Sequence, residues 1–139
     1  MKDAAVPAPL RNWFVVHFLV DMLFAVPLML APVYTLRLVG WEQVDPITAR
    51  LVAAALFGIG IESFLGRNAG GESYRGMLDL KIIWSLAAVL GMLVSMLQGA
   101  QGSPPIVWGL ISLFLAFNLL WVYWRVRLAN PAPAAQERE

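Results

Sequence analysis

The chain of 139 residues is 60% hydrophobic and only 14% charged, with a mean hydropathy of +0.69. A soluble domain of this size needs a more polar surface, so the composition indicates a protein of the lipid bilayer. A net charge of +1 argues against nucleic acid as a partner. The absence of cysteine excludes disulfides, thiolate metal sites and a cysteine nucleophile.

The first apolar segment runs from about Trp13 to Ala31 and contains Pro27, where we expect a kink. Its length suits a helix that crosses the hydrocarbon core, which takes about 20 residues. A signal peptide matches poorly, because His17 and Asp21 interrupt the apolar run and no clear small-x-small cleavage site is present. We therefore expect a first membrane span that carries an imidazole and a carboxylate one helical turn apart.

Three further apolar segments of similar length follow. Asp45-Pro46 and Ser103-Pro104 each place a capping side chain before a proline, which is typical of a helix start. We expect these three spans at about residues 46–66, 75 or 76–98, and 104–123.

The connections are predicted to be short. A piece with Arg37 and Trp41 is expected along the membrane interface, a polar loop at residues 67–75 and a tight turn at residues 99–102. The fold predicted from this pattern is an all-α, integral membrane four-helix bundle of residues 13–128. It lies between an N-terminal tail of residues 1–12 and a disordered C-terminal tail of residues 129–139.

Basic residues predict the orientation of the bundle, because cytoplasmic loops carry an excess of them. One side, which holds both termini and the second connection, carries eight basic residues, whereas the other side carries only two. The eight are Lys2, Arg11, Arg67, Arg75, Lys81, Arg125, Arg127 and Arg138, and the two are Arg37 and Arg50. We therefore expect a multi-pass protein of the cell membrane with both termini in the cytoplasm.

Polar residues from separate spans are predicted to meet at one depth. With a rise of about 1.5 Å per residue, His17, Asp21, Glu62 and Asn118 all fall in the cytoplasmic half of the bundle. Glu62 continues a line of small residues on the second span, which marks a face that packs against other helices, so we expect Glu62 to face inward. These positions form a predicted polar floor beneath an apolar chamber.

Lys81 and Ser85 share a face of the third span and are predicted to join this floor as ligand-binding residues. Asp79 points to another face and is expected to meet Arg75 or Arg67 in the loop. Asn118 and Trp121, three residues apart, share a face of the fourth span. Trp121 is alternatively part of an aromatic belt at the cytoplasmic interface.

Charge balance suggests proton chemistry. Asp21 and Glu62 are two acids against the single base Lys81, so the site has an excess carboxylate that holds a proton or shares it with His17. Such groups can act as general acid and base. The structural alternatives remain open: a hydrogen bond within one helix for the His–Asp pair, an ion pair that only joins two helices for Glu62 and Lys81, and interhelical packing for Asn118.

The arrangement of these residues resembles the EXPERA group, which includes sterol isomerases and sterol-binding membrane proteins. The resemblance spans residues 13–124 and rests on His17 with Asp21, on Glu62, and on Asn118 with Trp121. It implies that Asp21 and Glu62 donate and accept a proton, that His17 orients them, and that Asn118 and Trp121 line a cavity. The layout is also similar to DoxX-like four-helix bacterial membrane proteins.

Three functions agree with these observations. The first is binding of a lipophilic small molecule such as a sterol, terpenoid, quinone or lipid, with isomerase-like proton transfer as its chemistry. The second is an accessory or assembly subunit of a larger membrane complex. The third is a small proton- or ion-coupled transporter that acts as a homodimer. No cofactor and no metal site are predicted.

Overall fold

The computed structural model of the chain describes residues 6–99 and 104–130, and these are almost entirely helical. The elements are α1 (Ala8–Leu30), α2 (Pro32–Leu38), α3 (Pro46–Leu65), the 3-10 turn η1 (Gly66–Asn68), α4 (Gly71–Leu97) and α5 (Ile106–Ala129). Four of the helices, α1, α3 with η1, α4 and α5, are long and apolar enough to cross a membrane. The expected tail residues 1–5 and 131–139, and most of the expected turn at residues 99–102, lie outside the described part.

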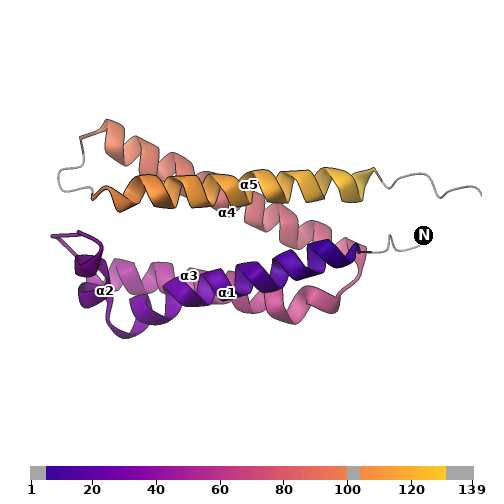
Figure 1. The fold of residues 1–139 in the computed structure, drawn as a ribbon, viewed down its shortest axis with the longest axis horizontal. Helices are drawn as coiled ribbons and strands as arrows, with labels where there is room; N and C mark the ends of the chain where they lie inside the picture. The colour runs from indigo at the N-terminus through magenta and orange to yellow at the C-terminus, as the bar shows by residue number, and fades with distance from the viewer. Residues whose placement is uncertain (1–5, 100–103, 131–139) are drawn as a thin grey trace, which may run out of the picture.

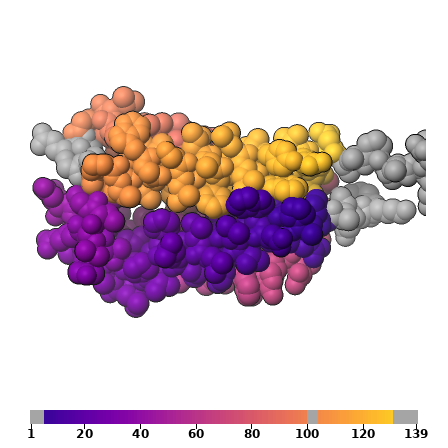
Figure 2. Space-filling view, in the orientation of Figure 1, coloured from indigo at the N-terminus to yellow at the C-terminus, as the bar shows by residue number. Residues whose placement is uncertain are grey.

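The long helices form two pairs, α1 with α3 and α4 with α5, which lie against each other as two layers (Figure 1). The start of α1 and the end of α5 lie at one end of the bundle, here called the proximal end. The short helix α2 lies at the opposite, distal end. Figure 2 shows the surfaces of α1 and α5 meeting near the proximal end.

Helix α1 begins at Ala8, five residues earlier than the predicted start at Trp13. The physical reason is packing, because Leu10 is fully buried and belongs to a proximal apolar cluster with Phe14. The helix continues through Pro27 to Leu30. The carbonyl oxygen of Pro27 accepts hydrogen bonds from the Ala31 backbone N–H and from the Thr35 hydroxyl, both beyond the end of α1.

Helix α3 confirms the predicted cap. Asp45 stands at the N-cap in extended conformation, its carboxylate accepts a hydrogen bond of 2.9 Å from the Ile47 N–H, and Pro46 occupies the first helical position. The helix ends at Leu65, one residue before its predicted end.

Three other predicted boundaries were wrong. Helix α5 has Pro105 at its N-cap, without a side-chain hydrogen bond, and not Ser103 as predicted. Helix α4 begins at Gly71, inside the segment expected to be a polar loop, because Tyr74 is fully buried and its hydroxyl donates a hydrogen bond of 2.6 Å to the Arg67 carbonyl. Helix α5 continues to Ala129, six residues beyond the predicted end, because Trp124 and Leu128 pack into the proximal cluster.

Apolar clusters close both ends of the bundle. The proximal cluster consists of Val6, Leu10, Phe14, Tyr74, Met77, Leu78, Trp121, Trp124 and Leu128. The distal cluster consists of Val89, Val107 and Ile111, with Trp41 packed against it. All four long helices contribute to the buried polar side chains of the described residues, which are His17, Asp21, Ser63, Lys81, Ser85 and Asn118.

Asp79 pairs with a different arginine from the two that were predicted. The Arg125 Nε donates to Asp79 Oδ1 at 2.7 Å, and the pair is partly exposed. Arg75 instead donates to the Leu128 carbonyl at 3.3 Å. The long α5 brings Arg125 alongside the first turns of α4, which the shorter predicted span did not anticipate.

Candidate functional site

The site starts from the buried face of α1. His17 and Asp21 are one turn apart on this face and are 8% and 5% exposed. His17 Nδ1 lies 3.0 Å from Asp21 Oδ2. The prediction that this pair points into the bundle is therefore confirmed.

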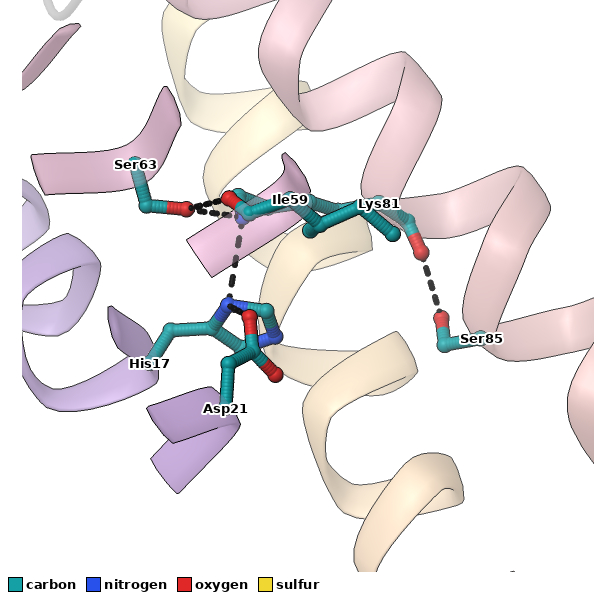
Figure 3. A network of polar contacts seen from close by, with 6 residues as sticks. All are labelled: His17, Asp21, Ile59, Ser63, Lys81 and Ser85. Carbon is teal, nitrogen blue, oxygen red and sulfur yellow. Dashed lines mark hydrogen bonds and ion pairs between the residues drawn. The ribbon is translucent and has the colours of Figure 1, made fainter. Parts of the chain in front are cut away.

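Lys81 reaches the same imidazole from α4, as Figure 3 shows. Its Nζ lies 3.2 Å from His17 Nδ1 and donates a hydrogen bond of 2.5 Å to Ser63 Oγ on α3. Ser63 Oγ donates in turn to the Ile59 carbonyl at 2.6 Å, so its lone pairs are free to accept from Lys81. Lys81 is 2% exposed.

A single imidazole nitrogen thus lies within hydrogen-bond distance of both an acid and a base. Nδ1 has one in-plane position, so it can bond only one of these neighbours at a time. As an acceptor it would take a proton from Lys81, and as a donor it would give one to Asp21 Oδ2, which has no hydrogen-bond partner among the described residues. Among the described residues, no carboxylate oxygen lies within 4.0 Å of Lys81 Nζ. The protonation state of His17 therefore decides which of its two neighbours it bonds.

Two further polar residues, Ser85 and Asn118, form hydrogen bonds at the backbone of α4 next to Lys81. Ser85 Oγ donates to the Lys81 carbonyl at 2.7 Å, and Asn118 Nδ2 donates to Ser85 Oγ at 2.9 Å. Asn118 Nδ2 also lies 2.9 Å from the Ile82 carbonyl. Asn118, Ser85 and Lys81 are therefore brought together as predicted, and the network joins all four long helices.

Aromatic rings form the apolar wall of this cluster. Trp121 is fully buried, with its ring centroid 5.1 Å from that of His17, and the Phe117 ring lies 4.9 Å from His17. Lys81 Nζ lies 5.0 Å from the Phe14 ring centroid and 5.5 Å from the Trp121 centroid. Among the described residues, the Trp121 indole N–H has no hydrogen-bond partner. Trp121 belongs to the cluster and not to an exposed interfacial belt.

Glu62 is exposed, so the prediction that it points into the bundle was wrong. Its side chain is exposed, whereas its neighbour Ser63 is fully buried. The buried positions of α3 are Ala49, Ala53, Leu56, Ile59, Gly60 and Ser63. The expected line through Glu62 is rotated from this face because each residue turns an α-helix by about 100°.

Gly60 explains which face of α3 is buried. A Cβ atom at this position would lie 2.8 Å from Asp21 Cβ and 3.1 Å from Asp21 Oδ2, so α3 and α1 touch closely only because the side chain is absent. At Gly58 an added Cβ would meet nothing within 4 Å. Sequence reasoning missed Gly60 and Ser63, although Ser63 directly follows Glu62 and Gly60 lies two residues before it.

The donor set favours acid–base chemistry. Within residues 6–99 and 104–130, no three His, Asp or Glu side chains come together in a way that could hold a metal ion. What the geometry offers is a carboxylate, an imidazole and an amine in one buried chain of contacts, with aromatic rings beside them. Comparison of the chain with models of protein families, with curated proteins and with solved structures finds no match.

Proposed function

We propose that this is a multi-pass protein of the cell membrane with both termini in the cytoplasm. The proximal end carries Arg11, Arg67, Arg75, Arg125 and Arg127, whereas the distal end carries Arg37 and Arg50. This excess supports a cytoplasmic proximal end by the positive-inside rule. The polar cluster then lies in the cytoplasmic half of the membrane.

Within that frame, we propose that the protein binds a lipophilic small molecule against the polar cluster and moves a proton on it. The observation that carries this proposal is the position of His17 Nδ1, 3.0 Å from Asp21 Oδ2 and 3.2 Å from Lys81 Nζ. Ionisable side chains inside a membrane protein are costly to bury and are therefore most often functional. A flat, largely apolar ligand such as a sterol, terpenoid or quinone suits a wall of aromatic rings.

The residues divide the work as follows. Asp21 and Lys81 are the acid and base, and His17 passes the proton between them and the ligand. Ser85 and Asn118 hold the α4 backbone at Lys81, and Trp121 packs against the ligand and offers its N–H to a ligand oxygen. The resemblance to the EXPERA isomerases implies the same role for Asp21 in proton transfer and for Trp121 beside the ligand, but it implies that His17 orients the acids and that Asn118 lines the cavity. Glu62 has no place in this scheme, because its side chain is exposed.

Thermal stability in detergent tests the proposal, with and without sterols, quinones, fatty acids and carotenoids. A ligand at about 100 times its Kd stabilises the folded state by about 2.7 kcal/mol, which is a shift of several degrees in Tm. We expect at least one lipophile to raise the Tm of the wild type and to lose this effect with Asp21→Asn. Glu62→Gln is the matched control and keeps the effect.

The two variants separate the possible explanations. If Glu62→Gln loses the ligand response and Asp21→Asn keeps it, the assignment of the site to the buried cluster is wrong. If no lipophile in the panel shifts the wild type, the binding function loses its support.

A second candidate is an accessory or assembly subunit of a larger membrane complex. The observation in its favour is that Ser63, Lys81, Ser85 and Asn118 satisfy one another's hydrogen bonds, as a network that only fixes the bundle would do. In that case Asp21→Asn changes Tm without changing the response to any lipophile. Co-purification of partner proteins from native membranes would then identify the complex.

A further inference from the structure

Lys81 differs from the other basic residues in the described part of the chain. Of the ten basic residues in the sequence, eight are arginines and only Lys2 and Lys81 are lysines. A guanidinium stays charged and does not act as a nucleophile, whereas a lysine amine can lose its proton and attack a carbonyl carbon. The basic side chain in the buried cluster is therefore one that can form a covalent bond to a ligand.

The contacts of Lys81 suit a nucleophile better than a structural cation. Its Nζ contacts a hydroxyl and an imidazole nitrogen, and within the described residues it has no carboxylate within 4.0 Å. Buried ammonium groups normally rely on such a carboxylate, because desolvation of an unpaired charge is costly. His17 Nδ1, at 3.2 Å, is placed to take a proton from the amine.

We propose that Lys81 forms an imine with a lipophilic aldehyde or ketone and so holds its ligand covalently. This inference rests on the proposed function, since the ligand must first bind at the cluster. It narrows the ligand class to compounds with an apolar body and a carbonyl group. Phe14 and Trp121, whose rings lie 5.0 and 5.5 Å from Nζ, would pack beside that body.

The reaction balances without an oxidant or reductant. The Nζ lone pair forms a bond to the carbonyl carbon, and the carbonyl oxygen gains a proton while nitrogen loses one to His17. The nitrogen lone pair of this carbinolamine then forms the C=N bond as the C–O bond breaks, and the oxygen takes a second proton and leaves as water. The nitrogen loses its remaining proton to give the imine. One carbonyl and one amine therefore give one imine and one water. His17 and Asp21 return the protons that the nitrogen releases.

Reductive trapping tests the proposal with dodecanal as the probe. Wild-type protein in detergent is treated with dodecanal and sodium cyanoborohydride, and the alkylated amines are located by peptide mass spectrometry. We expect Lys81 to be alkylated faster than Lys2 and the amino terminus, by about tenfold or more, because neighbouring groups catalyse proton transfer. Lys2→Arg is the matched control and retains the Lys81 adduct, whereas Lys81→Arg loses it.

Two further measurements keep the test independent of any loss of folding. In the wild type, excess dodecanol should slow alkylation of Lys81 but not of the amino terminus, because it competes for the site. In His17→Gln protein that remains monodisperse, Lys81 alkylation should slow by about tenfold or more. Alkylation at equal rates at all amines, or an unchanged rate in His17→Gln, overturns the proposal.

The failure of this proposal can be told apart from failure of the proposed function. If dodecanol or a sterol raises the Tm of the wild type but dodecanal does not alkylate Lys81, the binding function stands and the imine does not. If no lipophile shifts the Tm and Lys81 is not alkylated, both are wrong.

Discussion

The contact between Gly60 and Asp21 gives the sharpest test of how α1 and α3 pack. A Cβ at residue 60 would lie 2.8 Å from Asp21 Cβ and 2.9 Å from the methyl group of Met22. The methionine can move aside, but Asp21 Cβ is attached directly to the α1 backbone. Gly60→Ala therefore forces the two helices apart or displaces the carboxylate from His17.

The expected magnitude follows from two opposing terms. Replacing glycine by alanine within a helix favours the helix by about 1 kcal/mol, and this gain is common to Gly60→Ala and Gly58→Ala. Overpacking costs about 1 to 3 kcal/mol and applies only at residue 60, because a Cβ at residue 58 meets nothing within 4 Å. The two variants should therefore differ in free energy of unfolding by about 1 to 3 kcal/mol.

The assay is unfolding in mixed micelles by titration with sodium dodecyl sulphate, followed by tryptophan fluorescence. Gly58→Ala should be as stable as the wild type or slightly more stable, and Gly60→Ala should be the less stable of the two. Equal stability of the two alanine variants, or a lower stability of Gly58→Ala, would refute the close approach of α3 to Asp21 and the assigned buried face.

Two other predictions concern a helix cap and an interhelical hydrogen bond. Asp45 accepts hydrogen bonds from Thr48 and a backbone N–H that lower its pKa, so its capping contribution is present above the unfolded-state pKa of about 4 and is lost as the pH falls through the lower folded-state pKa. Asp45→Ala should therefore lower the Tm at pH 7 and have little effect at pH 2; an equal effect at both would contradict this linkage. Asn118→Leu removes the hydrogen bond to Ser85 and should destabilise the bundle by about 1 to 2 kcal/mol, measured by the same unfolding titration, whereas Leu119→Ala on the exposed face should change little.

The four long helices could be predicted because each depends on a property local to its own segment. About 20 consecutive apolar residues specify a span, and Asp45-Pro46 specifies the start of α3. Helix ends were less predictable, because they depend on contacts between distant parts of the chain. Leu10 and Leu128 both belong to the proximal cluster, and their burial there extends α1 and α5 beyond the predicted ends.

The candidate site divides in the same way. His17 and Asp21 could be placed on one face because a spacing of four residues fixes their relation within a single helix. Glu62 could not be placed, because α3 carries small residues on two adjacent faces and both resemble a packing surface. Gly58 and Gly60 are equivalent in the sequence, and only the position of α1 distinguishes the exposed glycine from the buried one.

The pairing of the helices also accounts for why a lysine completes the site. Backbone approaches closer than 8 Å are concentrated within the α1–α3 and α4–α5 pairs, so the space between the pairs is wider. Large rings such as Phe14 and Trp121 fill that space. A short side chain such as Ser85 bonds only within its own pair, to the α4 backbone and Asn118. The four-carbon stem of Lys81 crosses the wider gap, which is how an amine on α4 contacts His17 on α1 and Ser63 on α3 together.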